Sequence, residues 1–276
     1  MKIVNNFQLG IAKFLRTLLL GILVSANGAA FADISAIRDV NEKITVLLSS
    51  QHLDYKEYQG GEISNSEKGA LPGIEISVPL VKNYMFDHEY LKLNLSGYKG
   101  QTDYVGQYMV GGSGYGSVRT KDNARITNYG LKYQKGFEIG SQTLVSPYFE
   151  VSSRNWLRGL NTYDETYQHS YYGLGLVGQV ALTNYLVVSM DALYGKTFNS
   201  RIEARGAVNF SAPLGNSSYS KLGLGANYLF TKYLFGQIEV SKINFDYGQS
   251  IPNNGFYEPD STTKSTFYKL GIGLRF

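Results

Sequence analysis

Apolar and polar side chains alternate residue by residue in several stretches of this chain. Every second residue of 268–276 is aliphatic or aromatic, while the residues between them are Lys, Gly or Arg. The stretches 74–80, 90–96 and 186–194 show the same period of two. Because successive side chains of a β-strand point to opposite faces, each stretch is predicted to be a strand with one apolar face.

Stretches of this kind follow one another from residue 44 to the C-terminus, and the predicted fold class is all-β. We predict ten strands, at 44–58, 71–81, 90–101, 124–136, 143–156, 168–181, 185–198, 216–230, 233–247 and 264–276. A count of eight is the alternative. The chain has no run of 18 apolar residues, which excludes a helical membrane protein.

The connections between the predicted strands alternate in length. Long polar connections are expected at 59–70, 102–123, 157–167, 199–215 and 248–263, with short turns between them. Transmembrane β-barrels have long loops at one end and short turns at the other. The pattern therefore predicts a transmembrane antiparallel up-and-down β-barrel with its apolar face toward lipid and both termini in the periplasm.

Aromatic residues of the apolar face fall near the predicted strand ends. Tyr172, Tyr194 and Tyr268 lie toward the long loops, and Tyr133, Tyr228 and Phe276 lie toward the short turns. Two such girdles are expected where a barrel crosses the two membrane interfaces. A secreted β-sandwich or lipocalin-like barrel would also alternate, but its apolar face would point inward. The loop lengths and aromatic ends favour the membrane barrel.

The first 32 residues have the pattern of a secretory signal peptide. Three basic residues precede the short apolar run 18–24, and Ala30-Phe31-Ala32 is a small-x-small cleavage site. The predicted domains are the cleaved signal peptide 1–32, a short periplasmic segment 33–43 and the outer-membrane barrel 44–276.

Composition and charge exclude several other classes of protein. The chain has no Cys, which excludes disulfide scaffolds, zinc fingers and thiol enzymes. Three of its 26 Lys and Arg residues lie in the leader, and no basic stripe remains after cleavage that would indicate nucleic-acid binding.

The leader, the amphipathic strands and the closing segment 268–276 resemble Gram-negative outer-membrane β-barrel proteins. Members of that family commonly end in an aromatic residue, as this chain does at Phe276. The resemblance implies recognition of Phe276 by the barrel-assembly machinery. By strand count the chain resembles the ten-stranded size class that includes omptin proteases and Opc-type adhesins. The resemblance does not assign a subfamily.

Candidate catalytic residues are sparse. His52 and Asp54 share one face of the first predicted strand, and Asp164, Glu165 and His169 gather around the third long connection. An acid and a histidine there could position a water for hydrolysis. The paired Asp residues of omptins have no match, and His169 and Ser170 point to opposite faces. The sequence therefore favours a polar barrel rim over an enzyme.

The face assigned to the barrel interior carries both signs of charge. Isolated charges are costly in an enclosed interior, so these side chains are expected to pair in a network that fills the lumen. A narrow pore lined by charge is the alternative. The nine residues are Glu75, Lys92, Lys132, Glu150, Arg154, Asp191, Lys221, Glu239 and Lys269.

The inward face also carries glycines at 173, 175, 223, 225, 271 and 273, which are expected to leave room for long neighbouring side chains.

The predicted function is that of a monomeric outer-membrane barrel with a largely filled lumen. It would act in surface binding, adhesion or envelope integrity through its loops, near Tyr104, Tyr108, Tyr115, Tyr163, Tyr167 and Tyr257. A narrow porin-like channel and an omptin-like protease or lipid hydrolase are the alternatives. Expected partners are outer-membrane lipid, lipopolysaccharide, the barrel-assembly machinery and an extracellular ligand.

No cofactor and no metal are expected. The Gly-rich segment 111–116 lacks the Lys-Ser/Thr ending of a phosphate loop and is predicted to be a surface loop. A Ca²⁺ site between loops is left open as the alternative to solvated acids, with Asp122, Asp164, Glu165, Glu258 and Asp260 as its ligands.

Overall fold

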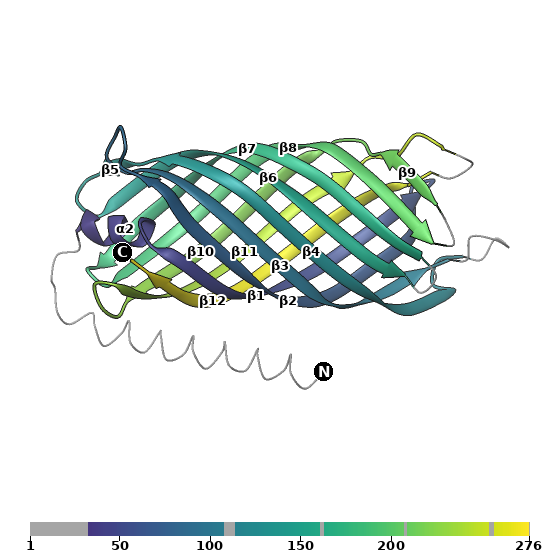
Figure 1. The fold of residues 1–276 in the computed structure, drawn as a ribbon, viewed down its shortest axis with the longest axis horizontal. Coiled ribbons are helices and arrows are strands. Elements are labelled where there is room, and N and C mark those ends of the chain that lie inside the picture. The colour runs from purple at the N-terminus through teal and green to yellow at the C-terminus, as the bar shows by residue number, and fades with distance from the viewer. Residues whose placement is uncertain (1–32, 108–113, 161–162, 207–208, 254–256, 276) are drawn as a thin grey trace.

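A computed structural model describes residues 33–107, 114–160, 163–206, 209–253 and 257–275. The predicted signal peptide, the predicted assembly signal Phe276 and Tyr108 lie outside these residues, as do residues 111–113 of the Gly-rich segment. The elements in chain order are α2 (Ile34–Asn41), β1 (Ile44–Gln59), β2 (Glu62–Lys82), β3 (Glu89–Gly106), β4 (Val118–Lys135), β5 (Phe137–Ile139), β6 (Thr143–Leu160), β7 (Tyr163–Thr183), β8 (Leu186–Gly206), β9 (Phe210–Pro213), β10 (Ser218–Leu229), β11 (Leu234–Tyr247) and β12 (Asp260–Leu274) (Figure 1).

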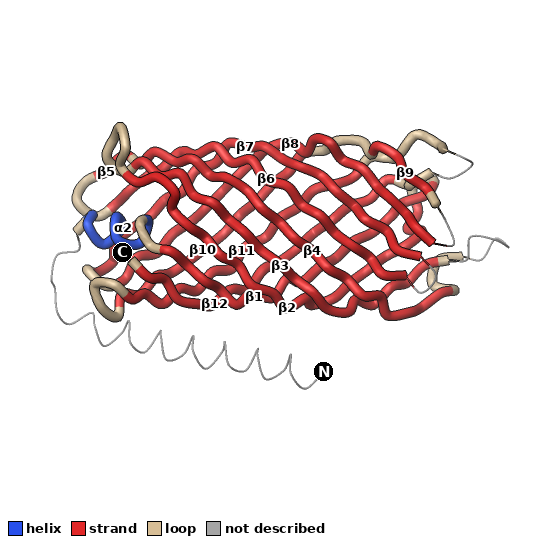
Figure 2. Tube along the Cα trace, viewed as in Figure 1, coloured by secondary structure: helices blue, strands red, loops and turns tan. Residues whose placement is uncertain are grey.

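Ten long strands form one closed antiparallel barrel. Neighbours in sequence pair with each other, β12 returns to pair with β1, and β8 pairs with β10. The short β9 and β5 pair with β8 and β6 outside this ring. The strands cross the long axis obliquely, as Figure 2 shows. The predicted barrel and its count of ten are confirmed, and the alternative of eight is wrong.

The outer surface carries an exposed apolar belt. It includes Leu48, Ile74, Leu131, Leu174, Leu176, Met190, Leu222, Leu224, Val240 and Ile272. The outward girdle residues Tyr172, Tyr194, Tyr268 and Tyr133 are likewise exposed. Isolated exposed apolar residues are ordinary, but a continuous belt of them marks a surface that contacts something other than water.

The prediction of long polar loops is wrong for most of their length. Residues 62–70, 102–106, 118–123, 157–160 and 199–206 continue the strands, so the barrel wall extends well past the apolar belt. β1 and β2 are joined by Gly60 and Gly61 alone, both with positive φ, as a tight hairpin requires. Most extensions were hidden because their inward residues are polar, such as Ser64, Thr102 and Asp122, and so show no apolar face. In 199–206 the alternation of Ile202 and Ala204 with charged residues is too short to stand out.

The structure forms a helix where the sequence suggested only a short segment. Helix α2 buries Ala36, Ile37 and Val40 against a cluster that includes Val187 and Phe235. It lies at the end of the barrel that also holds the C-terminus (Figure 1), which we call the turn end; the opposite end is the loop end. Residues at i, i+3 and i+4 share a helix face, and this short face is too small to stand out in the sequence.

Ion pairs hold α2 to the barrel wall. Arg275 pairs with Asp39, and with Glu42 at 3.4 Å, while Asn83 donates to Glu42 at 3.0 Å. On the inner side Asn41 donates to Gln179 at 2.7 Å, and Lys43 donates to Asn227. The helix is therefore held at the turn end of the barrel, where Val40 and Asn41 line the lumen cavity.

Inward glycines make room for long side chains, as predicted. A Cβ on Gly175 would lie 2.2 Å from the Tyr148 ring and 2.6 Å from the carbonyl oxygen of Ala192. A Cβ on Gly273 would meet the side chain of Lys43. Small residues at these places allow the lumen to be packed.

We expect Gly175→Ala to destabilise the barrel by about 1–3 kcal/mol, because the added methyl group overpacks against Tyr148 and rigid backbone. Urea unfolding in lipid vesicles measures the change. Gly178→Ala on the same strand is the matched control, since a Cβ there has no neighbour within 4 Å. Equal effects of the two substitutions would contradict the packing role of Gly175.

Candidate functional site

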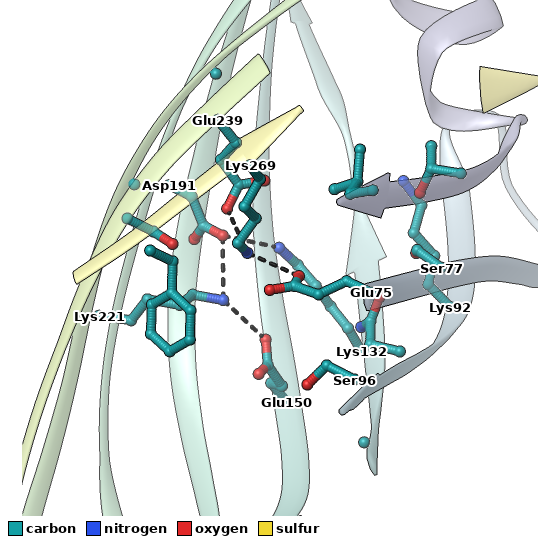
Figure 3. Close-up of a pocket in the computed structure, with 18 of the residues that line it drawn as sticks. Glu75, Ser77, Lys92, Ser96, Lys132, Glu150, Asp191, Lys221, Glu239 and Lys269 are labelled. Carbon is teal, nitrogen blue, oxygen red and sulfur yellow. Dashed lines mark hydrogen bonds and ion pairs between the residues drawn. The ribbon is translucent and has the colours of Figure 1, made fainter. Parts of the chain in front are cut away.

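Seven of the nine charged residues expected in the lumen form ion pairs there. Lys221 contacts Glu150 and Asp191, both at 3.2 Å, and Lys132 contacts Asp191 at 3.4 Å. Lys269 bridges Glu75 at 2.8 Å and Glu239 at 2.9 Å. Figure 3 shows these side chains converging from opposite walls. We call Glu75, Lys132, Glu150, Asp191, Lys221, Glu239 and Lys269 the lumen network.

Lys92 and Arg154 also face the lumen but have no carboxylate partner among the described residues. Lys92 donates to the side-chain oxygen of Asn41 at 3.3 Å, and Arg154 donates to Asn128 at 3.4 Å. The sequence predicted that both residues would join the network, because knowing that a residue lies on the inner face does not show which charged residues it meets.

On the turn-end side of the lumen network, Lys43 has no carboxylate partner in the described part of the chain. It follows α2 directly and is nearly fully buried. Burial, together with the nearby charge of Lys92, lowers the pKa of Lys43 to about 7. Its hydrogen bond to Asn227 and its position 5.1 Å from the centre of the Phe235 ring hold the amino group beside the helix.

A second charge cluster lies toward the loop end and was missed by sequence reasoning. Arg158 donates from Nε to Glu67 at 2.7 Å, and from Nη1 to Glu57 at 3.1 Å and Glu165 at 2.6 Å. All four side chains are buried. We call this set the acid–arginine cluster. The signal was that all four residues fall on the inward face, but only Glu57 lay in a predicted strand, whereas Glu67, Arg158 and Glu165 lay in segments interpreted as loops.

Glu258 adds a further carboxyl group beside this cluster. The hydroxyl of Tyr167 donates to Glu258 at 2.5 Å and that of Tyr55 at 3.4 Å. Burial raises the pKa of Glu258 well above its usual range, and the negative charges of Glu57 and Glu165 raise it further. Both phenolic hydroxyl groups donate to Oε1 of Glu258, but they supply no positive charge to balance its carboxylate form.

Aromatic side chains close the lumen at the level of this cluster. Tyr55 lies 4.9 Å from Trp156, Trp156 stacks on Tyr167 at 5.3 Å, and Tyr167 lies 5.4 Å from Tyr247. All four rings are almost completely buried. We call them the aromatic layer.

A cavity of about 310 Å³ remains in the lumen on the turn-end side of the aromatic layer, with α2 at its far end. Its lining includes the whole lumen network, Lys43, Lys92, Arg154 and His169. The lumen is therefore a charged chamber with a helix at one end and packed aromatic rings toward the other.

The candidate catalytic residues do not come together. Glu165 is bound to Arg158, Asp164 is exposed, and His169 is buried with its Nδ1 2.7 Å from the Tyr247 hydroxyl. His52 and Asp54 share a face, as predicted, but it is the outer one. There Asp54 pairs with Lys68 at 3.3 Å and His52 packs on Tyr268.

The acids considered for Ca²⁺ do not gather into one site, although Glu165 and Glu258 lie close enough to accept from the same Tyr167 hydroxyl. Asp260 accepts the backbone N–H of Gln249 at 2.7 Å, and Asp122 is buried with both carboxylate oxygens unpartnered among the described residues. Within the described ranges, no group of three or more His, Asp or Glu side chains is placed to hold a metal ion.

Tyr104 and Tyr167, expected near loops, lie in strands, whereas Tyr115 and Tyr257 are partly exposed at the loop end. In the part of the chain that the structure describes, no helix is both long and apolar enough to cross a membrane.

The closed antiparallel barrel with its apolar belt defines the class of the fold, which is that of the Gram-negative outer-membrane β-barrels. Among solved structures, the chain is similar to the outer membrane protease OmpT from Escherichia coli. The TM-score is 0.57 at 11% identity, over 85% of this chain and 95% of that one. At that identity the similarity concerns the fold.

Two other solved structures match with lower TM-scores. The translocator domain of the autotransporter NalP from Neisseria meningitidis gives a TM-score of 0.40 at 14% identity, over 96% of this chain and 98% of that one. Neisserial surface protein A gives 0.36 at 12% identity, over 84% and 97%. By sequence, no protein-family model and no curated protein matches the chain.

We expect Arg158→Met to destabilise the protein by about 3–5 kcal/mol, because it leaves three buried carboxylates without a counter-charge. Arg205→Met removes the same charge from the exposed pair with Glu203 and should cost less than about 1 kcal/mol. Urea unfolding in vesicles compares the two. Similar losses from both substitutions would show that the acid–arginine cluster contributes no more than a surface pair.

Proposed function

We propose that the protein is an outer-membrane barrel that conducts no solutes and acts in envelope integrity and surface binding from its loop end. The observation that supports this most strongly is the obstruction of the lumen at two levels, by α2 at the turn end and by the aromatic layer toward the loop end. Ten strands enclose only slightly more space than the eight-strand case that side chains fill.

The proposed orientation places both termini and the short turns in the periplasm, and the strand extensions outside the cell. Long connections face outward in bacterial barrels, and here the connections of the loop end are carried on extended strands. The proposed partner during insertion is the barrel-assembly machinery, for which the sequence supplies the terminal Phe276.

The loop end offers an ordered rim for binding. Gln59 donates to the Tyr257 hydroxyl at 2.8 Å, Gln107 donates to Gln59 at 3.3 Å, and the Tyr115 hydroxyl lies 2.7 Å from Ser66. Partly exposed tyrosines combine apolar area with a polar tip, which suits recognition. An ordered rim lowers the entropy that a partner must overcome on binding.

Neither alternative function has comparable support. A channel needs an open path, and the described lumen is crossed by packed rings. A hydrolase needs a base and an acid near one accessible point, whereas His169 is enclosed with Tyr247 as its partner. His88 does pair with Glu138 at 2.6 Å, but at the turn end.

The purified barrel should show no steady single-channel steps in planar bilayers. A variant lacking residues 33–41 should also stay closed, because the aromatic layer remains. Adding Trp156→Ala and Tyr167→Ala to this deletion should allow ion flow, with heat-modifiable gel migration confirming that each variant is folded. Steady steps from the unmodified protein would contradict the closed lumen.

For the lipid partner, we propose that the outer surface binds a phosphate-bearing lipid such as lipopolysaccharide. An outward groove over β2, β3 and β4 is lined by Pro72, Ile74, Leu95 and Tyr129. Gly97 leaves open space in it, and Lys99 and Arg125 stand opposite each other at its edge. An apolar groove with two exposed cations above it complements an acyl chain below an anionic headgroup.

The double substitution Lys99→Gln with Arg125→Gln should weaken binding of phosphorylated lipopolysaccharide about tenfold, since two exposed charge contacts are lost. Mixed-micelle titration measures the affinity. Lys121→Gln is the control, because Lys121 is already paired with Asp103 at 2.9 Å. Unchanged affinity in the double variant, or equal binding of dephosphorylated lipid, would refute the groove.

A further inference from the structure

The connection between β2 and β3 presents three large apolar side chains to its surroundings. Tyr84 is 81% exposed, Met85 is 66% exposed and Phe86 is 56% exposed. Figure 1 shows this connection standing out from the side of the barrel at the turn end, beside β5. Turns are normally built from Gly, Pro, Asn, Asp and Ser, so three consecutive apolar side chains at a tip require an explanation.

A bulge in β2 accounts for the sideways direction of this connection. The register between β2 and β3 shifts between Pro79 and Val81, and the intervening Leu80 is exposed. A bulge bends the strand that contains it. The chain therefore leans away from the wall before it turns, and the tip points outward from the barrel.

Hydrogen bonds within the connection hold the tip in one conformation. The Glu89 carboxylate accepts the backbone N–H groups of Met85 at 2.8 Å and Phe86 at 3.4 Å. The Asn83 side chain accepts the backbone N–H of His88 at 2.8 Å, and these two residues have positive φ of 50° and 58°. Residues other than glycine adopt that region rarely, and it persists only where the surroundings fix it. The apolar tip is thus a built feature of the fold.

The neighbouring connection extends the same apolar surface. Phe137 and Ile139 of β5 are both exposed. Lys135 joins the two connections, because its ammonium lies 5.2 Å from the ring centre of Phe86 and 5.9 Å from that of Phe137. We call Tyr84, Met85, Phe86, Phe137 and Ile139 the turn cluster.

The turn cluster continues the apolar belt of the barrel. Tyr133, one of the outward girdle residues, donates from its hydroxyl to Glu89 at 2.7 Å. Leu131 of the belt lies two residues before Tyr133 and is also exposed. Belt, girdle and turn cluster therefore form one surface, and the partner that covers the belt also reaches the cluster. For an outer-membrane barrel that partner is lipid.

Two lysines border the turn cluster. Lys82 is exposed at the end of β2, and Lys135 lies beside two aromatic rings. Lys135 donates to the backbone carbonyl of Asp87, and an ammonium carries two further donors. Aromatic side chains flanked by lysines are typical of a segment in the membrane interface, where the cations meet lipid phosphates.

We propose that the turn cluster is a phospholipid-docking site that enters the headgroup layer beside the barrel. Tyr84, Met85 and Phe86 lie at the boundary of headgroups and acyl chains, and Lys82 and Lys135 contact the lipid phosphates. The girdle residues contact lipids against the wall, whereas this tip reaches lipids beyond them. A contact on one side of the barrel fixes its depth and its tilt. The choice of leaflet rests on the proposed orientation, which makes it the periplasmic one.

The experiment places a tryptophan at the tip of the connection. Trp156 is the only tryptophan of the chain, and its Nε1 has no hydrogen-bond partner among the described residues. Trp156→Phe therefore gives a background without tryptophan fluorescence and leaves a ring in the aromatic layer. Met85→Trp is added, and the barrel is refolded into phosphatidylcholine vesicles with acyl chains brominated near the headgroup or near the methyl end. Heat-modifiable gel migration confirms that each variant is folded.

Met85→Trp should emit at a shorter wavelength than tryptophan in water. It should lose more fluorescence to bromine near the headgroup than to bromine near the methyl end. Tyr115→Trp in the same background is the matched control, because Tyr115 lies at the loop end and should not be quenched. Tyr84→Trp repeats the test at a second position. Water-like emission without quenching at both positions would overturn the proposal, whether the tip then faces water or a protein.

The two lysines are tested in the same vesicles. Lys82→Gln with Lys135→Gln, added to Met85→Trp, should shift the emission to a longer wavelength and reduce the quenching, because the tip then lies less deep. Lys264→Gln, an exposed change on the loop-end half of β12, should shift neither. Unchanged emission in the double variant would overturn the phosphate contacts.

The vesicle result does not depend on the direction of insertion, because both leaflets have the same lipid. The orientation is tested separately on intact cells with Tyr115→Cys, since the chain has no other cysteine. An impermeant maleimide should label this variant. Absence of labelling would contradict the proposed orientation and place the docking site in the outer leaflet, whereas absence of quenching would overturn the docking site alone.

Discussion

The structure depends on every backbone N–H and C=O of the wall having a partner in a neighbouring strand. Hydrocarbon offers no hydrogen bonds, so a sheet that faces lipid must close on itself. Here the closure comes from the pairing of β12 with β1, which joins the two ends of the strand order over nearly the full length of both strands. The apolar belt can face outward only because this ring leaves no free edge.

Closure in turn places polar side chains in a narrow interior, where charged side chains form ion pairs in two separate clusters. The lumen network uses two lysines that each bridge two carboxylates, and the acid–arginine cluster uses one arginine for three. Removing one partner from such a set leaves buried charge uncompensated, which costs more than the pair contributes when intact. Within the described residues, pairing is incomplete at Lys43, Lys92 and Arg154, which have hydrogen-bond partners but no carboxylate partner.

The proposed function assigns different roles to the two ends of the barrel. If helix α2 and the aromatic layer block passage as proposed, the surfaces left for recognition are the loop-end rim and the outer wall. The strand extensions hold that rim beyond the apolar belt, and the hydrogen bonds from Gln59 and Gln107 order it. A rigid wall that carries short connections is a suitable scaffold for binding.

The sequence by itself determined the barrel, its ten strands, the outward apolar face and the inward charges, because the alternation of side chains is a local property of each strand. It did not reveal that the polar stretches around Glu67 and Arg158 continue the strands, since water outside and mostly polar groups inside leave little contrast to read. Only the tertiary structure decided which charges meet: Lys269 finds Glu75 and Glu239 across the lumen, whereas Arg154 faces aromatic rings. Those partners are set by strand register and by closure of the ring, which are long-range properties that no single strand encodes.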